Sequence, residues 1–324
     1  MSTLTYREAV IRAIADAMRD DPDVFLLGED VGVSGGAFKM TEGLFGEFGP
    51  GRVLDTPISE QAIVGAAIGA AATGLRPVAE IMFADFAAVA FDQIVNQLAK
   101  YRYMTNGQVA LPVTIRMANG ANGFAAQHSQ ACENWFLNVP GLKLAMPGTP
   151  RHAYGLLRAA IADPDPVLFF EHKALFNAKE DIDGELGTAV LGRAETVRAG
   201  THVTIVATQL MVHRSLEAAE LLAADGIDAE VIDLLTLSPM DLETVLASVE
   251  RTNRLVVAQE STNAGSWGAS LIADVVREQL EALDGPPALV GGDDTPIAYS
   301  HVLEAAWIPS AERIAAAARE AVAY

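Results

Sequence analysis

The stretch His202-Val-Thr-Ile-Val-Ala-Thr208 is the clearest strand in the chain, because its β-branched residues lie between Gly200 and a polar turn. A helical pattern follows at 212–224 and ends at Asp225-Gly226. Short apolar runs that alternate with amphipathic helices are typical of βαβ units and a parallel sheet. The stretch therefore predicts an α/β fold.

The same alternation extends through the rest of the chain. In the second half we expect strands at 229–235 and 255–260, and helices at 242–250, 268–283 and 310–322. In the first half we expect strands at 25–27, 78–83, 113–117, 142–146 and 167–170, and helices at 6–19, 60–73, 85–103 and 150–162. Acidic and glycine residues interrupt the apolar pattern between the halves. We expect two domains, 1–180 and 199–324, joined by a linker at 181–198.

Composition narrows the class of protein. The 324 residues are 51% hydrophobic, which is enough to fill two cores. No apolar run reaches the roughly 20 residues that a membrane-spanning helix needs, and the N-terminus lacks a signal-peptide pattern. A net charge of −20 repels phosphate backbones and argues against nucleic acid. Cys132 is the only cysteine, which excludes an internal disulfide and fits a cytoplasmic protein.

The segment Asp55-Thr-Pro-Ile-Ser-Glu60 places a carboxylate at the start of a helix. An acid near a helix N-terminus is often only structural, because the exposed N–H groups favour negative charge. Here the helix continues with alanine, glycine and branched residues on every side, which predicts that it is buried. A partly buried carboxyl group can share a proton with a ligand nitrogen. Gly65 and Gly69 would let another helix approach closely.

Two other segments carry candidate functional residues. Phe86 follows the strand expected at 78–83, where an aromatic ring can stack on a flat heterocycle or simply belong to the core. His128 lies in a loop rich in glycine and asparagine and is flanked by Gln127, Ser129 and Gln130. Such a histidine can carry protons near neutral pH, or it can be an ordinary exposed loop residue. Nucleotide-loop, zinc-protease and serine-hydrolase motifs are absent from the sequence.

Together, DTPISE, FADFAAVAFDQIVNQLAKYRY, AAQHSQ, PGLKLAMPGTP, AAIADPDPVLFFE and VIDLLTLSPMD closely resemble the beta subunits of pyruvate, branched-chain 2-oxo acid and acetoin dehydrogenases. The resemblance spans nearly the whole chain in the same order. It implies a thiamine-diphosphate-binding α/β fold: a pyrimidine-binding domain and a transketolase-C-terminal-like domain, both with mainly parallel sheets.

The resemblance also assigns roles to residues. Glu60 matches the glutamate that binds a pyrimidine nitrogen of thiamine diphosphate and promotes its imino tautomer. Phe86 matches the aromatic residue that packs on the pyrimidine, and Ile58 and Glu29 are expected near the cofactor, Glu29 behind Glu60. His128 matches a histidine that helps the lipoyl group accept the acyl fragment.

Two ions follow from the same resemblance. In several relatives, main-chain carbonyls hold a potassium ion, and the matching residues here are Val113, Ala160, Ile161, Asp163 and Asp165. Asp165 stands where asparagine is frequent. The Gly-Asp-Gly and asparagine signature that holds Mg²⁺ and the diphosphate is absent from the sequence. We therefore expect an alpha subunit to hold Mg²⁺ and the cofactor's phosphates.

The expected assembly is an α2β2 heterotetramer that decarboxylates a 2-oxo acid, with pyruvate as first choice, or cleaves acetoin. The acyl group would pass to the lipoate of an acyltransferase core. Acidic residues near the C-terminus, namely Asp284, Asp293, Asp294 and Glu304, are expected to meet a basic domain of that core. The sequence leaves open which of these substrates is used. Two alternatives remain: the C-terminal half of a split transketolase, and a non-catalytic partner subunit with the same fold.

Overall fold

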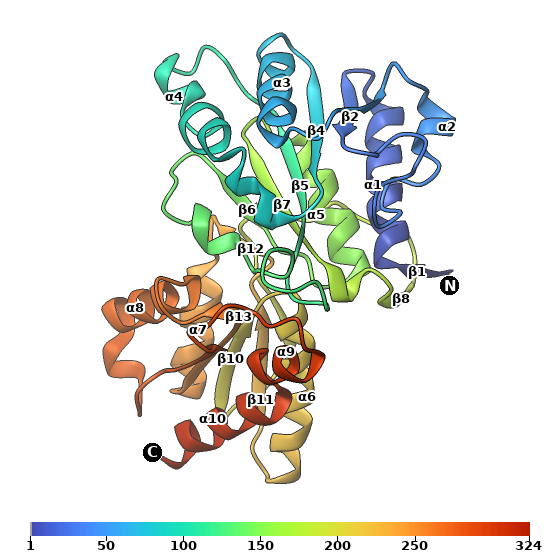
Figure 1. Cartoon of the computed structure of the whole chain (residues 1–324). Coiled ribbons are helices and arrows are strands. Elements are labelled where there is room, and N and C mark those ends of the chain that lie inside the picture. The colour runs from blue at the N-terminus through green and yellow to red at the C-terminus, as the bar shows by residue number, and fades with distance from the viewer. Residues whose placement is uncertain (1) are drawn as a thin grey trace. The chain divides into compact units, whose positions relative to one another are not determined.

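The structure, a computed structural model, describes residues 2–324. The chain divides into two compact units (Figure 1). The first contains residues up to Asn119 and Trp135–Leu191, and the second contains Gly120–Asn134 and Gly192–Tyr324. The boundaries expected from the sequence at 181–198 stay a prediction.

The first unit is built on a parallel sheet. Its strands lie in the order β6-β7-β5-β4-β2-β3, and every neighbouring pair among them is parallel. These strands are β2 (Val24–Gly28), β3 (Val53–Asp55), β4 (Arg76–Ile81), β5 (Thr114–Asn119), β6 (Lys143–Ala145) and β7 (Val167–His172). β1 (Ser2–Thr5) and β8 (Lys179–Ile182) form a separate antiparallel pair.

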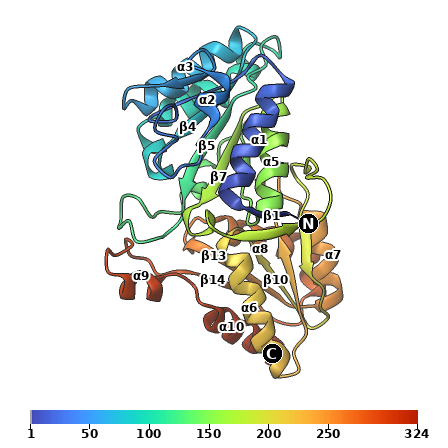
Figure 2. The same cartoon turned by 90° about the vertical axis from the view of Figure 1, so that its right-hand side faces the viewer.

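Helices connect these strands. The α-helices of the first unit are α1 (Tyr6–Asp20), α2 (Leu44–Phe48), α3 (Glu60–Ala72), α4 (Tyr101–Met104) and α5 (Pro150–Ala162). Shorter turns are the 3₁₀ segments η1 (Ala84–Ala88), η3 (Glu133–Phe136) and η4 (Lys173–Leu175), and the π-helical segment η2 (Gln93–Leu98). α1 and α5 pack side by side (Figure 2). α1 begins with a capping box, in which Thr5 and Glu8 each bind the other's backbone N–H.

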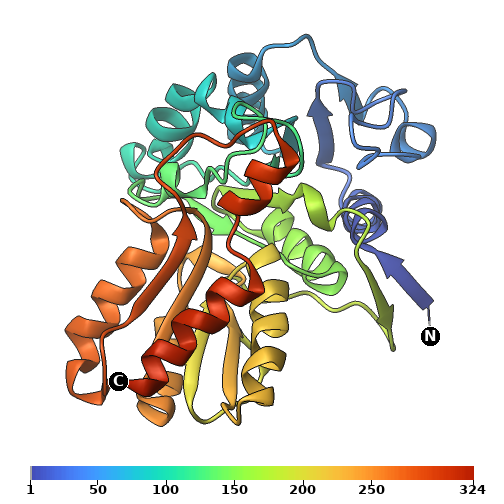
Figure 3. The ribbon, with the colours of Figure 1, turned by 60° about the horizontal axis from the view of Figure 1, so that its bottom comes forward.

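The second unit repeats the α/β plan with a sheet ordered β14-β13-β10-β11-β9. The strands of this sheet are β9 (Glu195–Arg198), β10 (Val203–Ala207), β11 (Ala229–Asp233), β13 (Leu255–Thr262) and β14 (Ala288–Gly292). β12 (Thr236–Ser238) is a short strand that does not belong to this sheet. The helices of the second unit are α6 (Leu210–Ala224), α7 (Leu242–Thr252), α8 (Trp267–Gln279), η5 (Leu280–Ala282), α9 (His301–Trp307) and α10 (Ala311–Ala323). In this sheet only the pairing of β9 with β11 is antiparallel. α6 and α10 pack together, as do α7 and α8 (Figure 3).

The prediction of an α/β fold with mainly parallel sheets is confirmed. The expected helix at 85–103 is wrong, since that range is divided among η1, η2 and α4. In η2 the N–H of Ala99 donates to the carbonyl of Ile94 five residues earlier. The expected strand at 229–235 is also interrupted, because Leu235 adopts a left-handed backbone with φ +58°. Among residues 2–324 no helix combines the length and the apolar character needed to cross a membrane.

A buried ion cluster joins the three central strands of the first unit. Arg116 on β5 is 1% exposed, and its Nε and Nη2 donate to Glu171 on β7 at 2.8 and 2.9 Å. Its Nη1 donates to Glu80 on β4 at 2.8 Å. Burial raises the pKa of both carboxyl groups, although the guanidinium opposes that rise. The cluster ties neighbouring strands together near their carboxyl ends.

Candidate functional site

Three predicted site residues follow neighbouring strands of the first sheet. Glu29 comes directly after β2, Glu60 follows β3 after a four-residue connection, and Phe86 lies in η1 after β4. These strands lie in the order β4-β2-β3 and are parallel, so their carboxyl ends share one edge of the sheet. Ligands of open α/β sheets bind at that edge.

Glu60 is the first residue of α3 and is only 8% exposed. Within residues 2–324 its carboxylate makes no hydrogen bond or ion pair. Ser59 occupies the N-cap position, but its side chain makes no capping bond. A buried carboxylate without a partner is costly unless a ligand supplies one. Glu60 is therefore placed to receive a hydrogen-bonding ligand.

The entry to α3 is fixed by Asp55, a residue that the sequence analysis gave no role. The backbone N–H of Gly32 donates to Asp55 Oδ1 at 2.6 Å. A Cβ on Gly32 would lie 2.5 Å from Asp55 Oδ2, so only glycine allows this close approach. The N–H of Thr56 also donates to the carbonyl of Gly28 at 2.9 Å. The loop after β2 thus holds the segment that leads to Glu60.

Glu29 is electrostatically coupled to Glu60. Burial raises the pKa of the Glu29 carboxyl group, and the negative charges of Asp30 and Glu60 raise it further. The structure therefore brings together the two acids that the sequence predicted at this site. A raised pKa favours a proton on Glu29, next to the carboxylate at the head of α3.

Phe86 and Ile58 present apolar surface at the same edge of the sheet. The Phe86 ring is half-buried and packs edge-on against Phe83, with ring centroids 5.6 Å apart and planes at 68°. Ile58 is 76% exposed, which is unusual for a large apolar side chain in a defined loop. Both residues therefore offer contact surface to a ligand or a second chain.

The sequence predicted that α3 is buried, and this prediction is wrong for one face of the helix. Ile63, Val64, Ala67 and Ala71 pack inward, whereas an opposite face of small residues is open. That open face consists of Ala62, Gly65, Ala66, Gly69 and Ala72. Apart from its chain neighbours and the helix's own backbone, no atom of the described chain lies within 4 Å of a Cβ built on Gly69. Continuous exposed apolar surface of this kind marks an interface.

His128 lies in the second unit, in the segment Gly120–Asn134 that the chain enters after β5. Its backbone N–H donates to the carbonyl of Ala125 at 3.3 Å. Glu304, which the sequence analysis placed on an acidic surface, is instead 7% exposed and accepts hydrogen bonds from Gly123 in this loop. That expectation for Glu304 is wrong, because charge alone does not distinguish a surface acid from one that binds buried amides.

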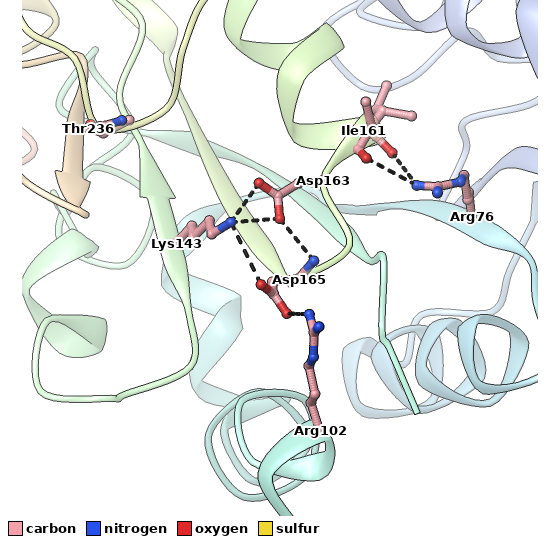
Figure 4. A network of polar contacts seen from close by, with 9 residues as sticks. Arg76, Arg102, Lys143, Ile161, Asp163, Asp165 and Thr236 are labelled. Carbon is pink, nitrogen blue, oxygen red and sulfur yellow. Dashed lines mark hydrogen bonds and ion pairs between the residues drawn. The ribbon is translucent and has the colours of Figure 1, made fainter. Parts of the chain in front are cut away.

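Three of the residues expected around potassium, Ile161, Asp163 and Asp165, make polar contacts with basic side chains (Figure 4). Lys143 Nζ contacts both carboxylate oxygens of Asp163 at 2.6 and 2.7 Å, and Arg102 pairs with Asp165. The side chains of Asp163 and Asp165 are thus paired with basic residues, and the ligands that the resemblance implies for an ion are main-chain oxygens.

Three of the five carbonyl oxygens already accept hydrogen bonds. The carbonyl of Val113 accepts from Val167 at 3.0 Å, and that of Ala160 from Asp163 at 3.2 Å. Arg76 donates to the carbonyl of Ile161 at 3.2 Å (Figure 4). Each carbonyl oxygen has a second lone pair, and the end of a helix favours a cation. A potassium ion held through these carbonyls stays a prediction.

Comparisons with known proteins agree with this geometry. Residues 2–179 match the transketolase pyrimidine binding domain, and residues 192–314 match the transketolase C-terminal domain. The chain is 47% identical to the acetoin:2,6-dichlorophenolindophenol oxidoreductase subunit beta of Cupriavidus necator, covering 98% of this chain and 97% of that protein. This chain belongs to the beta-subunit family of thiamine-diphosphate-dependent 2-oxo acid and acetoin dehydrogenases.

Other members of this beta-subunit family are nearly as similar. The chain is 44% identical to the mitochondrial pyruvate dehydrogenase E1 component subunit beta-2 of Oryza sativa subsp. japonica, over 98% of this chain and 86% of that one. It is 41% identical to the 2-oxoisovalerate dehydrogenase subunit beta of Bacillus subtilis, over 99% of each. A solved split gene transketolase, described as an inactive beta4 tetramer, is similar in fold, with a TM-score of 0.81 and 27% identity over 99% of this chain and 98% of that one.

The raised pKa of Glu29 has a measurable effect on stability. Its stabilising contribution is complete below the ordinary glutamate pKa and is lost as pH rises through the higher folded pKa. Glu29→Gln removes that loss, because glutamine stays neutral. We expect the melting temperature of Glu29→Gln, relative to wild type, to rise as pH increases above the ordinary glutamate pKa of about 4. The exposed control Glu250→Gln should show a constant difference, and the same constant difference for Glu29→Gln would contradict the coupling.

Proposed function

We propose that this chain is the beta subunit of a heteromeric thiamine-diphosphate-dependent dehydrogenase. The enzyme decarboxylates a 2-oxo acid, pyruvate first, or cleaves acetoin, and passes the acyl group to the lipoate of an acyltransferase. The observation that carries this proposal is the buried Glu60 carboxylate, which lacks a partner in the described chain and lies at the carboxyl edge of a parallel sheet.

The residues present fit an aminopyrimidine. Thiamine diphosphate, when bound, supplies a nucleophilic ring carbon that attacks the substrate carbonyl. The Glu60 carboxyl group would hold a proton at a pyrimidine nitrogen, and the Phe86 ring would pack on the pyrimidine face. Ile58 would cover its edge and exclude water. Glu29 would favour its protonated form beside Glu60, because the negative charge of Glu60 raises the pKa of Glu29.

The second half of the site would come from an alpha subunit in an α2β2 heterotetramer. This proposal is supported by the open Ala/Gly face of α3 beside Glu60, and by the names of relatives, which are themselves beta subunits. The chain lacks the Gly-Asp-Gly signature for Mg²⁺ and diphosphate. The alpha subunit would therefore hold Mg²⁺ and the phosphates, and a lipoyl acyltransferase would take the acyl group.

Sequence identity favours this function over the split-transketolase alternative. The 2-oxo acid and acetoin relatives are 41–47% identical, whereas the split transketolase is 27% identical. A sugar phosphate also needs basic residues, and the Gln127–Gln130 segment contains no lysine or arginine. A non-catalytic partner with the same fold is distinguished by the assay that follows.

The first test combines the chain with its alpha partner and offers pyruvate, branched-chain 2-oxo acids, 2-oxobutyrate and acetoin. We expect an α2β2 mass in solution and turnover of at least one substrate. Glu60→Gln should lower that turnover by roughly 10²–10⁴, because it removes an acid–base group of unchanged size. The exposed Glu185→Gln serves as control. Activity of this chain alone as a monomer, or an unchanged rate in Glu60→Gln, would refute the proposal.

The second test addresses His128. His128→Ala should lower acyl transfer to a lipoyl domain by roughly 10²-fold or more, the usual size of a lost acid–base contribution. Turnover with the artificial acceptor dichlorophenolindophenol should fall much less, because that assay does not use the lipoyl group. His213→Ala on α6 is the matched control. Equal losses in both assays would show that His128 does not act at the transfer step.

The third test addresses potassium. An ion that binds only the folded state raises the melting temperature in proportion to the logarithm of its concentration once the site is nearly saturated. We expect a higher melting temperature in potassium chloride than in choline chloride at equal ionic strength. Asp165→Asn should keep this difference, since it retains the main-chain carbonyl while losing the pair with Arg102. Identical melting temperatures in both salts would exclude the ion.

A further inference from the structure

The loop Gly120–Asn134 is held by contacts other than secondary structure. Before η3 begins at Glu133, none of these residues lies in a helix or strand. Gly120 and Gly123 have left-handed backbones, with φ of +78° and +79°. The N–H groups of such a loop need other acceptors, because an unpaired buried N–H is costly.

Two buried carboxylates supply those acceptors. Glu260, near the end of β13, accepts from the N–H of Ala121 at 2.5 Å. Glu304 on α9 accepts from the N–H of Gly123 with both oxygens, each at 2.9 Å. Both side chains are 7% exposed. Hydrogen bonds from a backbone N–H to a carboxylate are about twice as strong as neutral ones, so these two acids fix the start of the loop.

The end of the loop is attached to the same part of the second unit. Asn134 Nδ2 donates to Ser261 Oγ at 2.7 Å, and the N–H of Trp267 donates to Asn134 Oδ1 at 2.9 Å. Ser261 directly follows Glu260, and Trp267 is the first residue of α8. Both ends of the loop are therefore held beside the carboxyl end of β13.

Bonds inside the loop carry this restraint to His128. The N–H of Gly120 donates to the carbonyl of Gln130 at 3.2 Å and closes the loop across its base. The N–H of Phe124 donates to Ser129 Oγ at 3.2 Å, and Ser129 is fully buried. His128 lies inside this closed segment, one residue from Ser129. A shift of residues 121–123 would therefore move His128.

We infer that Glu260 and Glu304 are positioning residues for His128 and that they set the geometry of acyl transfer to the lipoyl group. This inference rests on the proposed function of His128. The anchoring of the loop is a separate property of the chain, and it is measured without any turnover.

The test uses Glu304→Ala and Glu260→Ala in the reconstituted complex, with Glu304→Gln as the conservative variant and the exposed Glu250→Ala as control. Hydrogen exchange of peptides covering 121–130 should become about tenfold faster or more in both alanine variants, as expected when a charge-assisted hydrogen bond is lost. Glu304→Gln keeps an acceptor oxygen and should restore part of the protection. Glu250→Ala should match wild type.

Activity then tests the positioning role. Acyl transfer to a lipoyl domain should fall about tenfold or more in both alanine variants, because small displacements of a catalytic group have large effects on rate. The fold-decrease in turnover with dichlorophenolindophenol should be less than half of the fold-decrease in acyl transfer. Unchanged exchange in both alanine variants would overturn the anchoring. Faster exchange with equal losses in the two assays would overturn the positioning role and leave the anchoring intact. If wild type turns over no substrate, the proposed function fails while the exchange result still decides the anchoring.

Discussion

The guanidinium of Arg116 is the contact on which the first unit most depends. It lies between Glu80 and Glu171 and joins three parallel strands at the centre of the sheet. Removing one partner of a buried ion pair lowers the free energy of unfolding by more than the pair itself contributes, because the remaining charge stays buried without a partner. The sequence therefore has to keep all three residues together. The cluster holds β4 against β5 and β7, and β4 is one of the three neighbouring strands whose carboxyl ends precede the candidate site residues.

Glu60 is also buried, but it differs from Glu80 and Glu171 in having no basic partner among residues 2–324. The backbone around it is fixed by Asp55 and Gly32, not by a cap on the helix. The rigid parts of the sheet thus hold an acid whose hydrogen-bonding capacity remains available. This arrangement is suited to binding a ligand nitrogen and is poor as a device for stability.

Much of this could be predicted from the sequence. Alternating apolar runs predicted the α/β fold. Hydrophobic residues recur with different periods in strands and in helices, and each long element shows the period of its own type. The same method failed at 85–103, where the apolar pattern does not distinguish an α-helix from 3₁₀ and π segments. It also missed short strands such as β3, whose three residues are too few to show a period. Glu29 and Phe86 were predicted by resemblance, and their common edge follows from the strand order.

The roles of Asp55, Glu260 and Glu304 could not be predicted, because each depends on a backbone N–H far away in the sequence. Glu304 is 181 residues from Gly123, and no local pattern records that contact. Composition gave a misleading expectation here, since an acid in an acidic chain is usually solvated. Three kinds of buried carboxylate bear on the candidate site within residues 2–324: those against a guanidinium, those against backbone amides, and Glu60, which has no hydrogen-bonding partner. The first two fix the backbone, and only the third leaves an acid able to exchange a proton with a ligand, so the partners of a buried acid indicate its role better than its burial does.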